Sequence, residues 1–208
     1  ADGYGVVWYR DARPVRTGGA RPLWQDGDLR RLLEGVSSST ILASVRNTTP
    51  GIPIEGGNQP LVHGRWSFIL NGFVESFRTS HMRALRSHLP DDLYGHLEGS
   101  SDSETLFLLA VDAVQKGATL VDALHRVRDI VLEAVQAENH AALLTMVLTD
   151  GNGIGVLPTA SEATTNSLYS ARGHPMAPDG TLLASERLDD HSSWEGVTPH
   201  DGLDIISL

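Results

Sequence analysis

The chain has 208 residues, a formal net charge of −10 and no cysteine. The acidic balance repels phosphate backbones and anionic lipid surfaces, so neither nucleic acid nor a membrane is an expected partner. The absence of cysteine excludes disulfides, thiolate metal sites and cysteine nucleophiles within the chain as given. Hydrophobic residues make up 40% of the composition, enough for the core of one domain.

The first half of the chain alternates short apolar runs with loops. Runs typical of strands occur at Val6–Tyr9, Thr40–Arg46, Trp66–Leu70 and Phe73–Phe77. The run at 40–46 is expected to be buried. Asp28–Leu33 predicts one or two turns of helix, and Asn47–Pro60 is rich in Pro and Gly and predicts a loop.

Helices dominate the middle of the chain. Ser80–His88 predicts a short helix, and a longer one begins with the capping-box pattern of Ser101 and Glu104 and ends near Gly117. A third helix follows after a short turn, and its apolar stripe consists of Leu120, Leu124, Val127, Val131 and Val135. The short connection predicts that the last two helices form an antiparallel pair.

Strands return in the last third. The sequence DGNG at Asp150–Gly153 predicts a hairpin between Leu143–Thr149 and Ile154–Leu157. Further strands are expected at Leu168–Ala171, Leu182–Ser185 and Asp204–Leu208. The order of strands, helices and strands predicts an α+β fold with antiparallel sheets. No linker or repeat divides the chain, so residues 1–208 are expected to form a single domain.

Arg46 is a first candidate for chemistry. It ends an apolar strand and precedes a loop rich in Gly and Pro. A guanidinium in that position can bind a carboxylate with two parallel hydrogen bonds. A surface salt bridge is the alternative interpretation, and the pattern leaves both open.

The dipeptide Asn71-Gly72 interrupts the predicted strand at 66–77 and also has two interpretations. Asn and Gly both tolerate positive φ, so the pair is typical of a type I′ hairpin turn. The side-chain amide and the adjacent backbone N–H could instead both donate to an oxyanion. The pattern alone favours the hairpin turn.

Asp102 lies in the first turn of a predicted helix, where a carboxylate interacts favourably with the helix dipole. An acid in that position could also bind a substrate ammonium group. The histidines show no metal-ligand spacing, so no metal site is expected. The acidic stretch Leu188–Trp194 predicts a polar loop in preference to a cation site.

Four motifs together resemble the class II glutamine amidotransferases, which are N-terminal-nucleophile (Ntn) hydrolases. They occur in family order along nearly the whole chain, as ADGYGVVWY (1–9), SVRNTTPG (44–51), FILNG (68–72) and SDSE (101–104). Leu70 stands where the family often has His. Within the family, the stretches 22–24, 45–55 and 182–197 look most like the stand-alone branch of the ergothioneine pathway.

The resemblance implies a role for each matched position. Arg46 would bind the α-carboxylate of a γ-glutamyl group, and Asp102 its α-ammonium. Asn71 and Gly72 would form the oxyanion hole. The γ-glutamyl pocket would also be lined by Thr49 and Gly51.

The implied fold is a four-layer αββα sandwich with two antiparallel sheets. The implied reaction is hydrolysis of a γ-glutamyl amide, and in the ergothioneine branch of γ-glutamyl-hercynylcysteine sulfoxide. It would proceed through a thioester and would need no metal or organic cofactor. A cytoplasmic location is expected, and the oligomeric state stays open.

The family's nucleophile is an N-terminal cysteine whose own α-amine serves as the base. The chain contains no cysteine, and the residues after Ala1 match a strand that lies further along in the family. We therefore expect an N-terminally truncated chain that lacks the nucleophile and the first strand and is inactive alone. Two alternatives remain, a glutaminase subunit that supplies ammonia to a synthase and a non-catalytic γ-glutamyl-binding protein.

Overall fold

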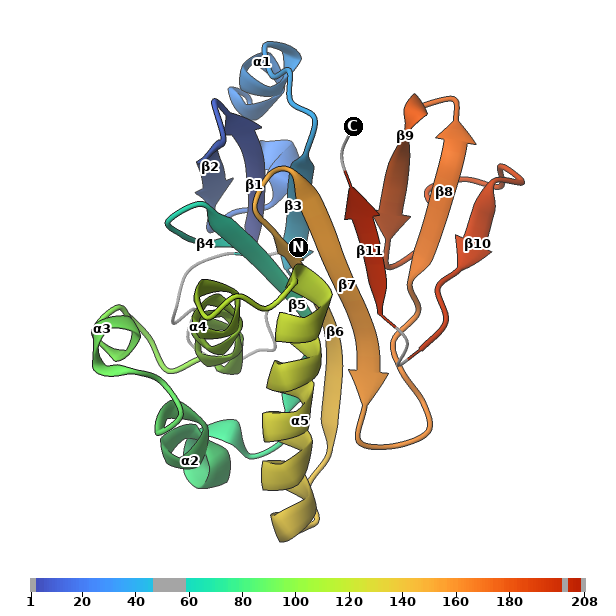
Figure 1. Cartoon of the computed structure of the whole chain (residues 1–208). Helices are drawn as coiled ribbons and strands as arrows, with labels where there is room; N and C mark the ends of the chain where they lie inside the picture. Colours follow the sequence, from blue (N-terminus) through green and yellow to red (C-terminus); the bar gives the residue numbers. More distant parts are fainter. Residues whose placement is uncertain (1–2, 47–58, 200–201, 207–208) are drawn as a thin grey trace.

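The computed structural model describes residues 3–46, 59–199 and 202–206. Their fold is α+β, and every strand ladder among them is antiparallel. Figure 1 shows three sheets and a group of helices that lies on one side of the largest sheet. Both the α+β class and the antiparallel pairing predicted from the order of elements are thus confirmed.

The largest sheet has five strands in the order β11-β7-β6-β5-β4. The strands are β4 (Leu61–His63), β5 (Trp66–Val74), β6 (Ala142–Thr149), β7 (Gly153–Ala160) and β11 (Leu203–Ile206). The β6–β7 connection is the hairpin that the DGNG sequence predicts. The helices on one face of this sheet are α2 (Met82–Arg86), α4 (Asp102–Gln115) and α5 (Leu120–Glu138).

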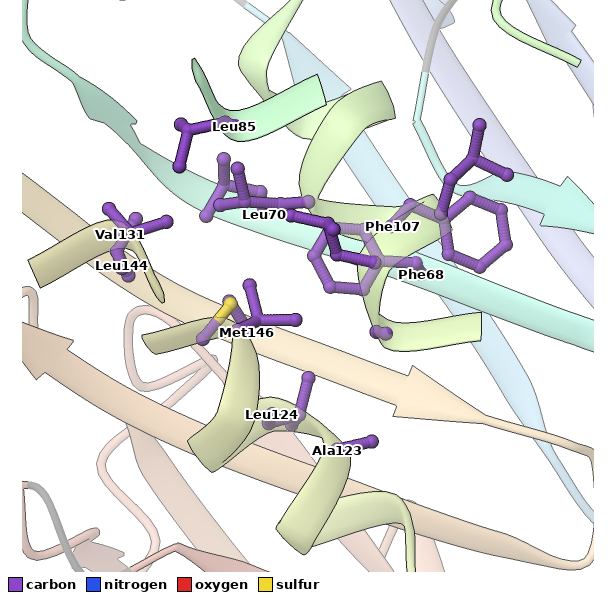
Figure 2. Close-up of a cluster of buried hydrophobic side chains, with 14 of the residues drawn as sticks. Phe68, Leu70, Leu85, Phe107, Ala123, Leu124, Val131, Leu144 and Met146 are labelled. Atoms are coloured by element: carbon purple, nitrogen blue, oxygen red, sulfur yellow. The ribbon is translucent and has the colours of Figure 1, made fainter. Parts of the chain in front are cut away.

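The main hydrophobic core lies between this sheet and its helices (Figure 2). Four apolar residues of the predicted α5 stripe are fully buried, namely Leu124, Val127, Val131 and Val135. The rings of Phe68 on β5 and Phe107 on α4 stack with their centroids 5.5 Å apart. Along β5 and β6, every second side chain faces the helices, as expected for strands with one face packed on a core.

The caps of α4 explain where this helix begins and ends. The Ser101 hydroxyl accepts a hydrogen bond from the Glu104 N–H at 3.2 Å, as predicted for the helix N-cap. The second half of the capping box is wrong: in the described residues the Glu104 carboxylate accepts from the N–H groups of Glu98 at 2.6 Å and Gly99 at 3.0 Å, not from Ser101, and so holds the preceding loop. Gly117, with a φ of +94°, ends the helix as expected.

The two smaller sheets have three strands each. The N-terminal sheet has the order β2-β1-β3, with β1 (Gly3–Arg10), β2 (Arg13–Gly19) and β3 (Ile41–Arg46). The C-terminal sheet has the order β10-β8-β9, with β8 (Tyr169–His174), β9 (Ala177–Ala184) and β10 (Trp194–Gly196). The short helical elements are η1 (Leu23–Gln25), α1 (Leu29–Glu34), the π-helical turn η2 (Phe77–His81) and α3 (Asp91–Tyr94).

The N-terminal sheet packs on the face of the five-stranded sheet that is opposite the helices. Val7, Tyr9 and Leu42 form a second core with Ile69 and Val147. The prediction that the 40–46 strand is buried is wrong for its outer face. Ile41 and Val45 are 53% and 63% exposed, because the described residues cover only the inner face of β3.

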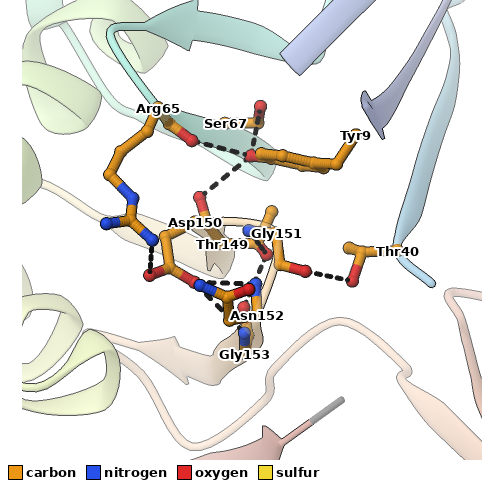
Figure 3. A network of polar contacts seen from close by, with 9 residues as sticks. All are labelled: Tyr9, Thr40, Arg65, Ser67, Thr149, Asp150, Gly151, Asn152 and Gly153. Atoms are coloured by element: carbon orange, nitrogen blue, oxygen red, sulfur yellow. Dashed lines mark hydrogen bonds and ion pairs between the residues drawn. The ribbon is translucent and has the colours of Figure 1, made fainter. Parts of the chain in front are cut away.

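Tyr9 joins the two stacked sheets through its hydroxyl group (Figure 3). The oxygen lies 2.8 Å from Ser67 Oγ, 3.0 Å from the Arg65 carbonyl oxygen and 3.2 Å from the Thr149 carbonyl oxygen. The β6–β7 hairpin is held in the same region by the Arg65–Asp150 ion pair at 2.9 Å. These contacts fix the relative position of β1, β5 and β6.

The hairpin turn favoured for Asn71-Gly72 is wrong. β5 runs without interruption from Trp66 to Val74, and β6 pairs with it from Ser67 onward, so the dipeptide lies inside a strand. The strand that keeps the dipeptide extended is β6, which lies more than 60 residues further along the chain. No local sequence pattern reveals this pairing. Asn71 is paired with Thr145 and Gly72 with Leu144.

The described layers are helices, the five-stranded sheet and a second layer of strands. The prediction of a fourth, helical layer and of an absent first strand stays a prediction. Among the described helices, none is both long enough and apolar enough to cross a membrane.

Candidate active site

A cleft of about 800 Å³ opens between β3, the β5–β6 pair and the end of β9. Four of the six site residues predicted from the sequence line it, namely Arg46, Asn71, Gly72 and Asp102. They come from β3, from β5 and from the first turn of α4. Thr49 and Gly51 lie outside the described residues. The fold therefore brings together every predicted site residue that the structure describes.

Asn71 and Gly72 form part of the cleft because of their places on β5. Strand alternation directs Asn71 to the same side as Ile69, away from the helices. Gly72 has a φ of +154°, and a Cβ atom there would lie 1.7 Å from the Leu143 carbonyl oxygen. Only glycine fits this close approach of β6, and Gly72 itself lines the cleft.

Gln59 is a site residue that the sequence analysis did not identify. Its side-chain amide pairs with the edge of β5, since Oε1 accepts from the Leu70 N–H at 2.5 Å and Nε2 donates to the Leu70 carbonyl oxygen at 2.9 Å. Nε2 also lies 3.4 Å from Ser103 Oγ. One side chain thus takes the place of a neighbouring strand just before Asn71. No local sequence signal marks such a role, because it depends on the tertiary contact between Gln59 and Leu70.

Asp102 connects the start of α4 to the end of β5. Its Oδ2 accepts a hydrogen bond from the Val74 N–H at 3.0 Å, and its Oδ1 accepts from the Ser103 N–H at 2.7 Å. The negative charge lies at the positive end of the helix dipole, which favours it. The carboxylate is therefore held in place at the border of the cleft, where it can meet a cation.

Arg46 is the last residue of β3 and lines the cleft together with Asp102 from the start of α4. Alternation along β3 places it on the inner face with Leu42, whereas Ile41 and Val45 face outward. A cleft that offers one guanidinium and one carboxylate is complementary to the two charged groups of an α-amino acid. Within the described ranges no group of three or more His, Asp or Glu side chains could hold a metal ion.

The remaining side of the cleft is formed by the end of β9 and the turn after it, including Ser185, Glu186 and Leu188. Asp189 holds this turn. One of its oxygens, Oδ1, accepts from His174 Nε2 at 3.1 Å, from the His191 N–H at 3.1 Å and from Trp194 Nε1 at 3.0 Å.

His174 is buried, and its Nδ1 accepts the Met176 N–H at 3.1 Å, so its proton lies on Nε2, facing Asp189. The hydrogen bonds from His174, His191 and Trp194 lower the pKa of Asp189 to about 2. The acidic stretch 188–194 is therefore an internally bonded polar loop, as predicted.

Comparisons with known proteins show which sequences and folds this chain resembles. No protein-family model matches the chain. The γ-glutamyl-hercynylcysteine sulfoxide hydrolase of Mycobacterium tuberculosis is 31% identical over 198 residues, which cover 95% of this chain and 72% of that protein. The probable glutamine amidotransferase DUG3 of Saccharomyces cerevisiae is 28% identical over 180 residues, 74% of this chain and 50% of that protein.

Among solved structures, a protein described as a glutamine aminotransferase class-II domain protein from Silicibacter pomeroyi superposes with a TM-score of 0.79 at 27% identity, covering 97% of this chain and 86% of that one. A predicted glutamine amidotransferase from Pseudomonas aeruginosa has a TM-score of 0.60 at 16% identity and covers 99% and 85%, which supports the fold alone. The chain belongs to the class II glutamine amidotransferase family, whose Ntn-hydrolase fold it shares.

Proposed function

We propose that the complete protein hydrolyses a γ-glutamyl amide in this cleft. The observation that carries the proposal is the convergence of Arg46, Asn71, Gly72 and Asp102, from three separate elements, on one cavity. Arg46 would bind the α-carboxylate and Asp102 the α-ammonium of the γ-glutamyl group. The scissile γ-carbonyl would then point toward Asn71 and Gly72.

The chemistry would begin with an N-terminal cysteine supplied by a segment that precedes Ala1. Its thiol sulfur attacks the γ-carbonyl carbon while its α-amine accepts the thiol proton. Asn71, through its side-chain amide, and Gly72, through its N–H, donate to the oxyanion that forms. The tetrahedral intermediate expels the amine, which takes up that proton and leaves a γ-glutamyl thioester. Water then hydrolyses the thioester to glutamate and regenerates the thiol, and no cofactor takes part.

The edges of two strands support a place for that segment. Within the described residues, β3 pairs only with β1 and β9 only with β8, and both strands line the cleft. A strand inserted between them would join the two small sheets into one and would carry its first residue to the cleft. Ile41 and Val45 line the cleft and stay largely exposed on the outer face of β3, where a helical layer could cover them and complete the proposed four-layer αββα sandwich.

For the substrate, we propose γ-glutamyl-hercynylcysteine sulfoxide, with glutamate and hercynylcysteine sulfoxide as products. Support comes from three hydrolases of that name, which are 28% to 31% identical over at least 95% of the chain. This assignment would place the protein in ergothioneine biosynthesis, in the cytoplasm, with a small molecule as its ligand. Glutaminase activity that feeds a synthase is the second candidate, supported by the likeness to the yeast amidotransferase.

Expression of the full reading frame, including any codons upstream of Ala1, tests the proposal. We expect glutamate release from γ-glutamyl-hercynylcysteine sulfoxide at a higher kcat/KM than from glutamine. Asn71→Ala should lower kcat by about 10²- to 10³-fold, as the loss of one oxyanion donor typically does. Arg10→Ala, a change at an exposed arginine on the same sheet as Arg46, is the matched control for Arg46→Ala.

The other outcomes separate the alternatives. A preference for glutamine would favour the glutaminase. A reading frame that starts at Ala1, together with binding of glutamate and no turnover, would favour a non-catalytic binding protein. Full activity of the Arg46→Ala or Asn71→Ala variant would contradict the assigned site.

A further inference from the structure

Thr145 is a buried residue whose hydroxyl has no hydrogen-bond partner among the described residues. It lies on β6, is 3% exposed and belongs to the lining of the cleft. A buried hydroxyl without a partner is unfavourable, and such groups in native proteins call for an explanation. The residue lines the cleft, but its hydroxyl oxygen is itself covered.

Other buried threonines of this protein are bonded. Thr149, four residues further along the same strand, donates to the Gly153 carbonyl oxygen at 2.5 Å and accepts from the Gly151 N–H at 3.0 Å. Thr105 on α4 lies 3.3 Å from the Ser101 carbonyl oxygen and 3.1 Å from Arg86 Nε. These buried hydroxyls thus have hydrogen-bond partners nearby, whereas the Thr145 hydroxyl has none among the described residues.

Thr145 lies beside Asn71, which is proposed to bind the γ-carbonyl end of the substrate. It is the direct partner of Asn71 in the β5–β6 ladder. Side chains of such a pair lie on the same face of the sheet with Cβ atoms about 5 Å apart. Asn71 is exposed and Thr145 is covered, so Thr145 lies deeper in the cleft beside the proposed oxyanion donor.

We propose that the Thr145 hydroxyl binds the γ-carboxyl group of the ligand and positions it against Asn71 and Gly72. This inference rests on the proposed function, because it takes that function's ligand and orientation. The hydroxyl and the methyl group of threonine are both attached to Cβ. A rotation of roughly 120° about χ1 therefore brings the hydroxyl to the place of the methyl. A carboxylate oxygen in the cleft gives the hydroxyl the acceptor that it lacks.

Two threonine-to-valine changes on one strand test the inference, since valine removes the hydroxyl and keeps the shape. In the 208-residue chain, Thr145→Val should raise the Kd for L-glutamate, measured by calorimetry, about tenfold, which corresponds to one hydrogen bond. Its thermal unfolding midpoint should be unchanged or higher, because no bond is lost in the free protein. Thr145→Ser should restore the affinity to within about threefold, since it keeps the hydroxyl.

Thr149→Val is the matched control and should show the opposite pattern, with a lower unfolding midpoint and an unchanged Kd. An unchanged Kd in Thr145→Val would overturn the inference. A fall in its unfolding midpoint like that of Thr149→Val would also overturn it, because the hydroxyl would then have a structural partner.

The Arg46→Ala variant distinguishes a failure of the role proposed for Thr145 from a failure of the proposed binding site. If Arg46→Ala abolishes glutamate binding and Thr145→Val leaves it intact, the role of Thr145 is wrong and the proposed site stands. If the unchanged chain binds no glutamate, or binds it without dependence on Arg46, the proposed function and this inference fail together.

Discussion

The carboxylate of Asp102 accepts a hydrogen bond from the Val74 N–H at 3.0 Å, two residues after Gly72. This contact joins the first turn of α4 to the part of β5 that carries the proposed oxyanion donors. One carboxylate thus has two tasks, to hold the strand in place and to present a negative charge to the cleft.

The substitution Asp102→Asn separates these two tasks. The amide keeps one oxygen for either the Val74 or the Ser103 N–H, so we expect a loss of about 1 kcal/mol in the free energy of unfolding. The negative charge is lost, so the affinity for L-glutamate should fall about 10- to 100-fold. Calorimetry and urea unfolding of the same samples measure both effects.

Asp112→Asn is the control for this experiment. Asp112 lies on the same helix and pairs with Lys116 at 2.7 Å, so the change removes the same charge outside the cleft lining. Its affinity for glutamate should stay unchanged. Equal affinities in the Asp102 and Asp112 variants would refute the role of Asp102 in binding.

Gly72→Ala is expected to destabilise the protein by roughly 2–4 kcal/mol, because the new Cβ would lie 1.7 Å from the Leu143 carbonyl oxygen. Gly117 also has positive φ, but a Cβ there meets nothing within 4 Å. Gly117→Ala should therefore cost only about 1–2 kcal/mol, the cost of backbone strain. Urea unfolding compares the two, and equal losses would show that β6 moves aside at Gly72.

Elements set by local patterns could be predicted from the sequence. The cap at Ser101, the glycine that ends α4 and the DGNG hairpin each depend on residues a few positions apart, and each is confirmed. The spacing of apolar residues in α5 likewise predicted which side of the helix is buried, because the period of the helix fixes it.

The errors concern features that depend on distant segments. Asn71-Gly72 has the composition of a turn, and only the pairing with β6 shows that it is part of a strand. The side chain of Gln59 pairs with Leu70 on β5, 11 residues further along the chain. The predicted site residues could be brought together only by the family resemblance, since three separate elements supply them.

The Tyr9 hydroxyl predicts how stability depends on alkaline pH. Burial, with a smaller contribution from Asp150, raises the pKa of Tyr9 from its ordinary value of 10.0 to about 12. Tyr9 therefore ionises at a lower pH in the unfolded chain than in the folded protein. The stability that it contributes is fully present below pH 10 and should be lost between about pH 10 and 12. In Tyr9→Phe this loss should be smaller, and the free energy of unfolding at neutral pH should fall by about 1 kcal/mol. An unchanged slope of stability against pH in that window would show that other groups cause it.

The lowered pKa of Asp189 predicts that stability falls as the pH becomes acidic, opposite to the effect of Tyr9. Hydrogen bonds from His174, His191 and Trp194 lower its pKa from 3.8 to about 2. A depressed carboxyl pKa contributes stability above pH 3.8 that is lost as the pH falls toward 2. Asp189→Asn should flatten the curve of unfolding midpoint against pH in this window. Asp190→Asn, at the exposed neighbouring residue, should leave the curve as it is, and identical curves for both variants would contradict the role of Asp189.

The most direct test of the central claim is a crystal structure of the chain with L-glutamate bound. We predict glutamate in the cleft, with its α-carboxylate on Arg46 and its α-ammonium on Asp102. Its γ-carboxylate should meet the side chain of Asn71 and the N–H of Gly72. Glutamate bound elsewhere, or in the cleft with its α-carboxylate at Asn71, would contradict the account.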